Sequence, residues 1–166
     1  MADRPALVFI GAPGAGKSRI GKRVARLLAL PFVDTDKRIV ASNGTITSIF
    51  EERGEPYFRA LEREQVELAL TEHAVVSLGG GAVLDERTQS DLEALRVVQL
   101  TVHPDAIASR NLSNRPLLAG GVEAWRALVA QRAPIYDRLA DASFDTTSEP
   151  AERIADAIVV WLGENP

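Results

Sequence analysis

The stretch GAPGAGKS, Gly11–Ser18, places two glycines, a lysine and a hydroxyl in the order G-x-x-x-x-G-K-[ST]. Glycines let the backbone wrap closely, so that successive N–H groups point at phosphate oxygens, and a following helix adds positive partial charge at its N-terminus. Lys17 can reach the β- and γ-phosphates of a nucleotide, and the Ser18 hydroxyl can ligate Mg²⁺. The sequence therefore predicts a nucleotide phosphate site at this loop.

Two carboxylates, Asp34 and Asp36, follow the short apolar stretch that begins at Phe32. One interpretation is a helix cap or a polar turn after a strand. With a phosphate loop present, the other interpretation is functional, because ligands of α/β proteins bind at the carboxyl ends of the strands. Asp34 would then hold the Mg²⁺ hydration shell, and Asp36 would contact an acceptor hydroxyl.

A second glycine-rich segment, VVSLGGGAVL, contains Gly79–Gly81 behind an apolar run. No Lys-Ser/Thr pair follows it, which disfavours a second phosphate loop. A tight turn is the simple alternative. The functional interpretation is that the missing side chains let an acceptor approach the backbone at the end of a strand.

Alternating strands and helices must position these residues, which predicts one α/β domain with a parallel sheet covered on both faces. Thr47 is expected to cap a helix, and Pro134 to kink or divide another. Predicted strands span residues 7–10, 32–34, 74–78, 96–102 and 143–147. Predicted helices span 17–28, a short stretch after 36, 47–53, 56–73, 85–95, a stretch from 104, 122–140 and 150–162.

Composition excludes several classes of protein. The 166 residues carry a net charge of −4 with an estimated pI of 5.3, which argues against a nucleic-acid binder. The absence of cysteine excludes disulfides and thiolate chemistry. No apolar run approaches the roughly 18 residues of a membrane span, so a cytoplasmic protein is expected. No N-K-x-D segment follows the phosphate loop, which disfavours a GTPase.

Six motifs in their order along the chain resemble those of the shikimate kinases: GAPGAGKS, FVDTD, IFEERGEPYFRALE, VVSLGGGAV, NRPLL and QRAPIYDRLAD. The resemblance implies a single-domain, nucleoside-monophosphate-kinase-like P-loop fold with a five-stranded parallel sheet and a lid over about residues 111–122. It also implies transfer of the γ-phosphate of ATP to the 3-hydroxyl of shikimate in aromatic amino-acid (chorismate) biosynthesis, with Mg²⁺ as cofactor.

The resemblance also implies roles for individual residues. Lys17, Asp36 and Arg115 would be catalytic, and Ser18 and Asp34 would hold the metal ion. Arg59 and Arg132 would grip the carboxylate of shikimate, which suits a guanidinium fork. Asp36 and the glycines Gly79, Gly80 and Gly81 would complete the acceptor side. ATP would contact Gly11, Gly14, Ala15, Gly16, Lys17, Ser18, Arg19, Arg110, Arg115 and Pro150.

Residues outside these motifs are expected to be structural or, for the two histidines, exposed to solvent. His73 and His103 lie at the ends of predicted elements, and Trp125 and Trp161 are expected to pack in the core. The expected partners are ATP and shikimate, with no nucleic acid and no membrane, and the expected state is a monomer. Two alternatives remain. One is another small-molecule kinase of the same fold, for gluconate or a nucleotide; the other is a nucleotide-binding module without phosphotransfer.

Overall fold

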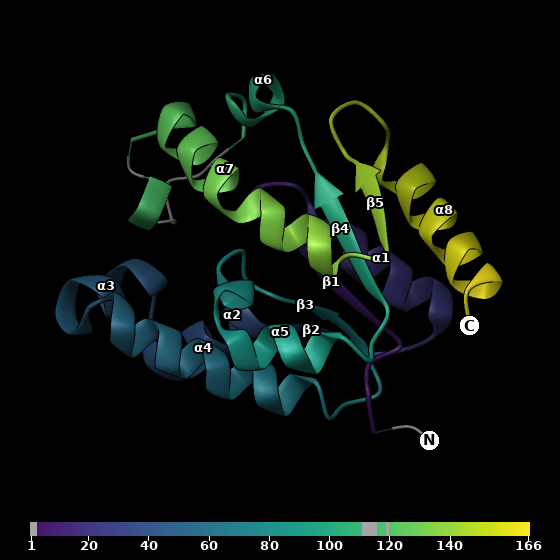
Figure 1. Cartoon of the computed structure of the whole chain (residues 1–166), viewed down its shortest axis with the longest axis horizontal. Helices are drawn as coiled ribbons and strands as arrows, with labels where there is room; N and C mark the ends of the chain where they lie inside the picture. The colour runs from purple at the N-terminus through teal and green to yellow at the C-terminus, as the bar shows by residue number, and fades with distance from the viewer. Residues whose placement is uncertain (1–2, 111–115, 119) are drawn as a thin grey trace.

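The computed structural model describes residues 3–110, 116–118 and 120–166 (Figure 1). Within these residues the strands form one parallel sheet in the order β2-β3-β1-β4-β5. The five-stranded parallel α/β fold expected from the sequence is thereby confirmed. The strands are β1 (Leu7–Gly11), β2 (Phe32–Asp34), β3 (Val75–Ser77), β4 (Val97–Thr101) and β5 (Ala142–Asp145).

Helices connect the strands and cover both faces of the sheet. The α-helices are α1 (Lys17–Leu28), α2 (Thr35–Asn43), α3 (Ile46–Arg53), α4 (Glu55–Ala69), α5 (Glu86–Leu92), α6 (Pro104–Ile107), α7 (Val122–Leu139) and α8 (Ala151–Glu164). Two short 3₁₀ turns, η1 (Ala82–Leu84) and η2 (Pro116–Leu118), complete the described elements.

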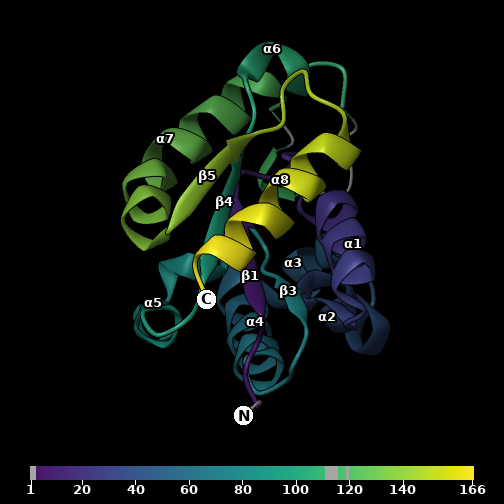
Figure 2. The ribbon, with the colours of Figure 1, turned by 90° about the vertical axis from the view of Figure 1, so that its right-hand side faces the viewer.

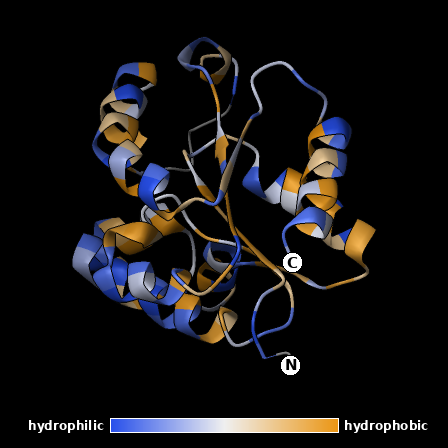
Figure 3. Ribbon diagram, turned by 45° about the vertical axis from the view of Figure 1, so that its right-hand side comes forward, coloured by the Kyte–Doolittle hydropathy of each residue, from blue (hydrophilic) through white to orange (hydrophobic). Residues whose placement is uncertain are grey.

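The central strand β1 is buried at all five positions, as a strand covered on both faces must be. Leu7 and Phe9 pack into one hydrophobic cluster with α1 and α8, whereas Val8 and Ile10 pack into another with α4, α5 and α7. Figure 2 shows α8 in front of the strands with α1 beside it, and Figure 3 shows hydrophobic colour along the central strands. The alternation of side chains along β1 therefore holds the two helical layers together.

A third, smaller cluster contains the buried side chains Ile39, Ile49 and Phe58. These residues come from α2, α3 and α4, which lie together at one side of the sheet (Figure 1). The cluster fixes α2 and α4 relative to each other, and both of these helices carry predicted site residues.

Three local expectations need correction. Helix α3 begins at Ile46 and is capped by Thr45, whose extended backbone lets its hydroxyl accept the Ser48 N–H at 3.1 Å, so Thr47 is not the cap. Helix α4 ends at Ala69 rather than near His73. Helix α7 runs through Pro134 as one helix, so this proline does not divide it.

None of the helices in the described ranges has the length and apolar character needed to cross a membrane.

Candidate active site

The phosphate loop, Gly11–Ser18, joins the end of β1 to the start of α1, as predicted. Gly14 and Gly16 have φ angles of 80° and 97°, values that favour glycine. Lys17 Nζ donates to the carbonyl of Gly11 at 2.7 Å and to that of Ala12 at 3.1 Å. Lys17 thus lies over the same loop that is expected to bind the phosphates of a nucleotide.

Arg110 and Thr146 form hydrogen bonds to carbonyl groups of this loop. The Arg110 guanidinium donates to the carbonyl of Gly14 and, at 3.3 Å, to that of Thr146. The buried Thr146 hydroxyl lies 2.6 Å from the carbonyl oxygen of Ala15. The sequence predicted Arg110 near the nucleotide but gave no role to Thr146, which follows β5 and meets the loop only in the fold.

Asp34 caps a helix, as one interpretation of its motif predicted, and it also contacts Ser18. One carboxylate oxygen, Oδ1, accepts the Lys37 N–H at 3.2 Å and caps α2. The other, Oδ2, accepts from Ser18 Oγ at 2.5 Å. The two predicted metal-binding side chains are therefore in contact, because the end of β2 lies near the start of α1.

A cavity of about 690 Å³, which we call the loop cavity, lies over these groups. The phosphate loop forms one wall and the ends of β2 and β3 form another. Its lining includes Gly14, Gly16, Lys17, Ser18, Arg19, Asp34, Asp36, Gly79 and Gly80. Most of the predicted donor-side residues therefore share one space, and the glycines after β3 share it too.

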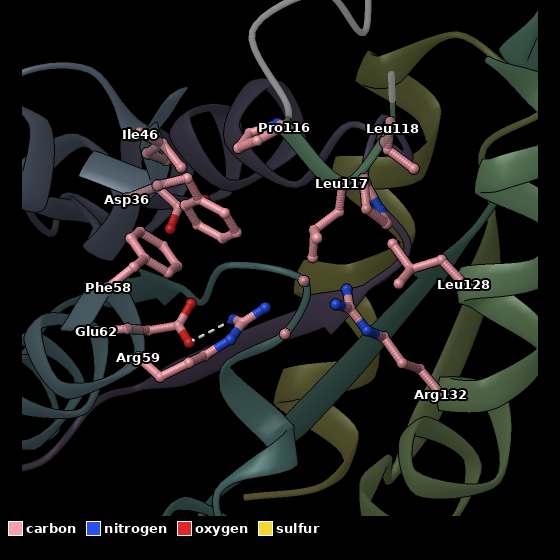
Figure 4. Close-up of a pocket in the computed structure, with 14 residues that line it drawn as sticks. Asp36, Ile46, Phe58, Arg59, Glu62, Pro116, Leu117, Leu118, Leu128 and Arg132 are labelled. Atoms are coloured by element: carbon pink, nitrogen blue, oxygen red, sulfur yellow. Dashed lines mark hydrogen bonds and ion pairs between the residues drawn. The ribbon is translucent and has the colours of Figure 1, made fainter. Parts of the chain in front are cut away.

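A neighbouring cavity, which we call the arginine cavity, lies between α4 and α7 (Figure 4). Arg59 enters it from α4 and Arg132 from α7, so the two predicted carboxylate-binding residues face the same space. Arg132 is only 4% exposed. Asp36 lines both this cavity and the loop cavity, which places its carboxylate between them.

Glu62 is a site residue that sequence reasoning missed. It is 3% exposed and accepts from Arg59 Nη1 at 2.8 Å (Figure 4). Burial raises the pKa of Glu62 to about 7; the Arg59 cation opposes this rise, the nearby Asp36 charge adds to it, and the Arg132 cation opposes it. Its signal in the sequence is the spacing of three from Arg59, which puts both side chains on one helix face.

The triple glycine gives these charged side chains room. A Cβ on Gly79 would lie 2.5 Å from Asp36 Oδ1, and one on Gly81 would lie 2.7 Å from Arg59 Cζ. A Cβ on Gly80 would lie 3.2 Å from Arg132 Nη1. Because real Cβ atoms essentially never come within 3.0 Å of another atom, Gly79 and Gly81 leave the room that Asp36 and Arg59 occupy, whereas a Cβ on Gly80 would make a tight contact with Arg132.

Tyr136 is a second residue that sequence reasoning missed. Its hydroxyl donates to the Gly80 carbonyl at 2.6 Å, and its ring is buried under the glycine segment. Burial raises the pKa of Tyr136, so it remains a neutral hydrogen-bond donor. It lies four residues after Arg132 on α7, which is the helical spacing that brings both to one face.

A third cavity, of about 280 Å³, lies beside the phosphate loop and contains predicted ATP-binding residues. Gly14, Ala15, Gly16, Arg19 and Arg110 line it together with Thr146, Glu149, Ala151 and Ile154. Pro150 caps α8 between two of these residues but is not among the described residues that line the cavity. Arg115 and half of the predicted lid, residues 111–115 and 119, lie outside the described residues.

The two histidines and the two tryptophans considered above are not among the residues that line these three cavities. His73 and His103 are exposed, and His103 caps α6 by accepting the Asp105 N–H. Trp161 packs against the cluster of α1 and α8, and Trp125 is buried in it, as expected. Within the described part of the chain, no group of three or more His, Asp or Glu residues forms a metal cluster.

Comparison with known proteins identifies the family of this chain. Residues 13–163 match the family described as shikimate kinase. A shikimate kinase from Thermobifida fusca is 45% identical, the match covering 98% of this chain and 97% of that protein. The structure of a shikimate kinase from Acinetobacter baumannii in complex with shikimate superposes with a TM-score of 0.90 at 31% identity, covering 98% of this chain and 94% of the other.

A gluconokinase from Sinorhizobium meliloti superposes with a TM-score of 0.58 at 18% identity, covering 99% of this chain and 94% of the other. Such a likeness shows a shared fold and leaves the acceptor open. The match to shikimate kinases is of a different order, because it extends over nearly the whole chain at 45% identity. The chain therefore belongs to the shikimate kinase family.

Proposed function

We propose that this protein transfers the γ-phosphate of ATP to the 3-hydroxyl of shikimate, giving shikimate 3-phosphate and ADP for aromatic amino-acid (chorismate) biosynthesis. The observation that carries the proposal is the position of Asp36, whose side chain lines both the loop cavity and the arginine cavity. A donor phosphate on one side and an acceptor hydroxyl on the other would meet at this carboxylate.

The donor side is proposed to be the phosphate loop. Its N–H groups, the Lys17 ammonium and the N-terminus of α1 favour the β- and γ-phosphates of ATP. The Ser18 hydroxyl and Asp34 carboxylate are hard oxygen donors in contact with each other, and they fit Mg²⁺, which uses few protein ligands beside water and phosphate. When bound, Mg²⁺ would neutralise charge that develops on the phosphate oxygens.

The acceptor side is proposed to be the arginine cavity. Arg59 and Arg132 supply two guanidinium forks for the carboxylate of shikimate. Ile46, Phe50 and Phe58 supply apolar surface for its ring. The backbone N–H groups of Gly80 and Gly81 would face the acceptor, whereas that of Gly79 donates to Thr35 Oγ1 at 3.4 Å. The Acinetobacter baumannii relative, whose structure contains shikimate, supports this choice of acceptor.

In the proposed reaction, the 3-hydroxyl oxygen forms a bond to the γ-phosphorus while the bond from that phosphorus to the β–γ bridging oxygen breaks. Asp36 orients the hydroxyl and accepts its proton late, because a loose transition state needs little base strength. Lys17 and Arg115 stabilise the transferring phosphoryl group. A lid over about residues 111–122 closes on the site and excludes water that would hydrolyse ATP.

A coupled assay of ADP release with a panel of acceptors tests this function. Shikimate should accelerate ATP consumption strongly, whereas gluconate and nucleoside monophosphates should not. Faster turnover with gluconate or a nucleotide would move the protein to that acceptor class. Tight ATP binding without acceleration by any acceptor would indicate a binding module.

Asp36→Asn tests the proposed role of the central carboxylate. We expect turnover to fall by about 10²-fold or more, the scale of general-base catalysis, while ADP binding persists. Turnover close to that of the unmodified enzyme would contradict the role.

We also propose that the enzyme acts as a cytoplasmic monomer. Light scattering on the purified protein would test the monomeric state.

A further inference from the structure

The carbonyl groups of the phosphate loop are held by side chains from several parts of the chain. Lys17 holds those of Gly11 and Ala12, Arg110 that of Gly14, and Thr146 that of Ala15. The remaining carbonyl in this run, that of Pro13, accepts from Trp125 Nε1 at 2.8 Å. Trp125 therefore completes a set of side chains that bind the carbonyl groups of this loop.

The hydrogen bond from Trp125 lies in the protein interior. Trp125 is 2% exposed and packs in the hydrophobic cluster of α1 and α8. Pro13 is buried as well. An unsatisfied carbonyl is costly in such surroundings, so the indole N–H has a role that an apolar ring of the same size could not fill.

Pro13 lies where the donor side meets the acceptor side. Its ring lines the arginine cavity, and a Cβ on Gly80 would lie 3.2 Å from Pro13 Cγ. Its peptide continues into Gly14, which lines the loop cavity. A shift of Pro13 would therefore change the position of the loop relative to the triple glycine.

The planarity of the peptide explains what the anchor does. In a trans peptide the C=O and the following N–H point in opposite directions, so fixing one fixes the other. With the Pro13 carbonyl held toward Trp125, the Gly14 N–H points away from α7. This is the direction that a ring of backbone N–H groups around an anion requires.

We propose that Trp125 is a positioning residue for phosphoryl transfer: its indole N–H fixes the Pro13–Gly14 peptide of the phosphate loop from helix α7. The same helix carries Arg132, so α7 sets both the loop that holds the donor and a side chain that faces the acceptor. This inference rests on the proposed function only for the identity of the acceptor.

The test compares Trp125→Phe with Trp161→Phe. The first change removes the N–H donor and keeps an aromatic ring; the second is the same substitution at a tryptophan on α8 whose ring packs in the same cluster. ADP affinity is measured by calorimetry with Mg²⁺ and without acceptor, beside the KM for ATP, the turnover number and the thermal midpoint. Because ADP binding needs no acceptor, the result can be read even if shikimate is not the substrate.

We expect Trp125→Phe to weaken ADP binding by about three- to tenfold, the worth of one buried hydrogen bond, and to raise the KM for ATP in parallel. Trp161→Phe should leave both unchanged. Equal ADP affinity in the two variants would overturn the inference. This holds even if Trp125→Phe alone has a lower thermal midpoint, because Trp125 would then contribute to core packing and not to the position of the loop.

A second replacement keeps the test decisive if Trp125→Phe does not fold. Substitution of Trp125 by β-(3-benzothienyl)alanine exchanges the indole N–H for sulfur and preserves the shape of the side chain. The same three- to tenfold loss of ADP affinity is expected from loss of the single donor. Unchanged ADP affinity in this variant would overturn the inference.

Discussion

Arg132 combines deep burial with a position facing the acceptor side. Its side chain is 4% exposed and lies within reach of the glycine segment, whereas Arg138, two turns further along α7, hydrogen-bonds Gln89 at the surface. Both are arginines in the same motif of the sequence. Their different surroundings make them a matched pair for testing recognition of the acceptor carboxylate.

Arg132→Lys should raise the KM for shikimate by about 10- to 100-fold, because lysine keeps the charge but loses the bidentate fork. The KM for ATP should change little. Steady-state kinetics with each substrate varied measure both effects, and Arg138→Lys serves as the control. A shikimate KM as low as that of the control would exclude Arg132 from binding the carboxylate.

Glu62 makes stability depend on pH. Its pKa is raised from an ordinary value of 4.5 to about 7, so between these values the folded protein keeps a proton that the unfolded chain releases. The free energy of unfolding should therefore fall as pH rises from 4.5 to 7, by on the order of 2 kcal/mol for this group.

Urea unfolding of the protein and of Glu62→Gln at intervals from pH 5 to pH 8 measures this contribution. Glutamine cannot ionise, so the variant should lose the fall in stability and have the flatter profile. Parallel profiles would show that Glu62 titrates at its ordinary value.

At the scale of elements, the ends of β3 and β5 bring backbone and side chains to the phosphate loop. The glycine segment after β3 leaves no room for a Cβ at Gly79, whereas nothing lies within 4 Å of a Cβ at Gly163 on α8. Thr146 follows β5 and donates to the loop through its hydroxyl. The contacts at Gly79 and at Thr146 both depend on the parallel register of the sheet, which sets where β3 and β5 end.

Gly79→Ala should displace Asp36 or Glu62 and lower shikimate kinase turnover by at least about tenfold, with a stability loss of about 1–3 kcal/mol typical of overpacking. Gly163→Ala is the control, because alanine there fills open space and favours the helix. Turnover and denaturant midpoints measure both variants. Full activity of Gly79→Ala would mean that the site tolerates a side chain at this position.

Thr146→Val should weaken ADP binding by about three- to tenfold, because valine keeps the shape of threonine and leaves the Ala15 carbonyl unsatisfied. Thr146→Ser retains the hydroxyl and should bind ADP almost as the unmodified protein does. Calorimetry distinguishes the two. Equal affinities for valine and serine would assign the contact to packing alone.

At the scale of the whole molecule, two hydrophobic clusters on opposite faces of one sheet support different walls of the site. The cluster of α1 and α8 lies under the phosphate loop and includes Trp125, whereas the other includes Tyr136 below the triple glycine. Ligands that bridge these walls bind the folded chain and not the unfolded one. They should therefore stabilise the entire fold.

ADP with Mg²⁺ at a hundred times its Kd should add about 2.7 kcal/mol to the free energy of unfolding. EDTA should remove the part of this gain that depends on the metal ion, and Asp34→Asn should reduce the same part. Thermal midpoints with ADP, with and without Mg²⁺, measure the effect. Equal midpoints with Mg²⁺ and with EDTA would argue against the proposed site at Ser18 and Asp34.

The sequence alone determined the parallel α/β fold, because buried strands and amphipathic helices have periodicities that local composition encodes. It also predicted the phosphate loop, whose motif is one contiguous segment of the chain. It located Arg59 and Arg132 through a family resemblance rather than through their spacing. The N-cap of α3 was misplaced by two residues, since both Thr45 and Thr47 could serve as its cap.

Only the tertiary structure decided which distant groups meet. Glu62 is unremarkable in the sequence until burial beside Asp36 and the arginines raises its pKa. Thr146, Tyr136 and Trp125 acquire their contacts with glycine-rich backbone because separate strands and helices converge at one edge of the sheet. Local patterns encode elements, but hydrogen bonds across 56 to 131 residues of chain exist only once the core fixes where those elements lie.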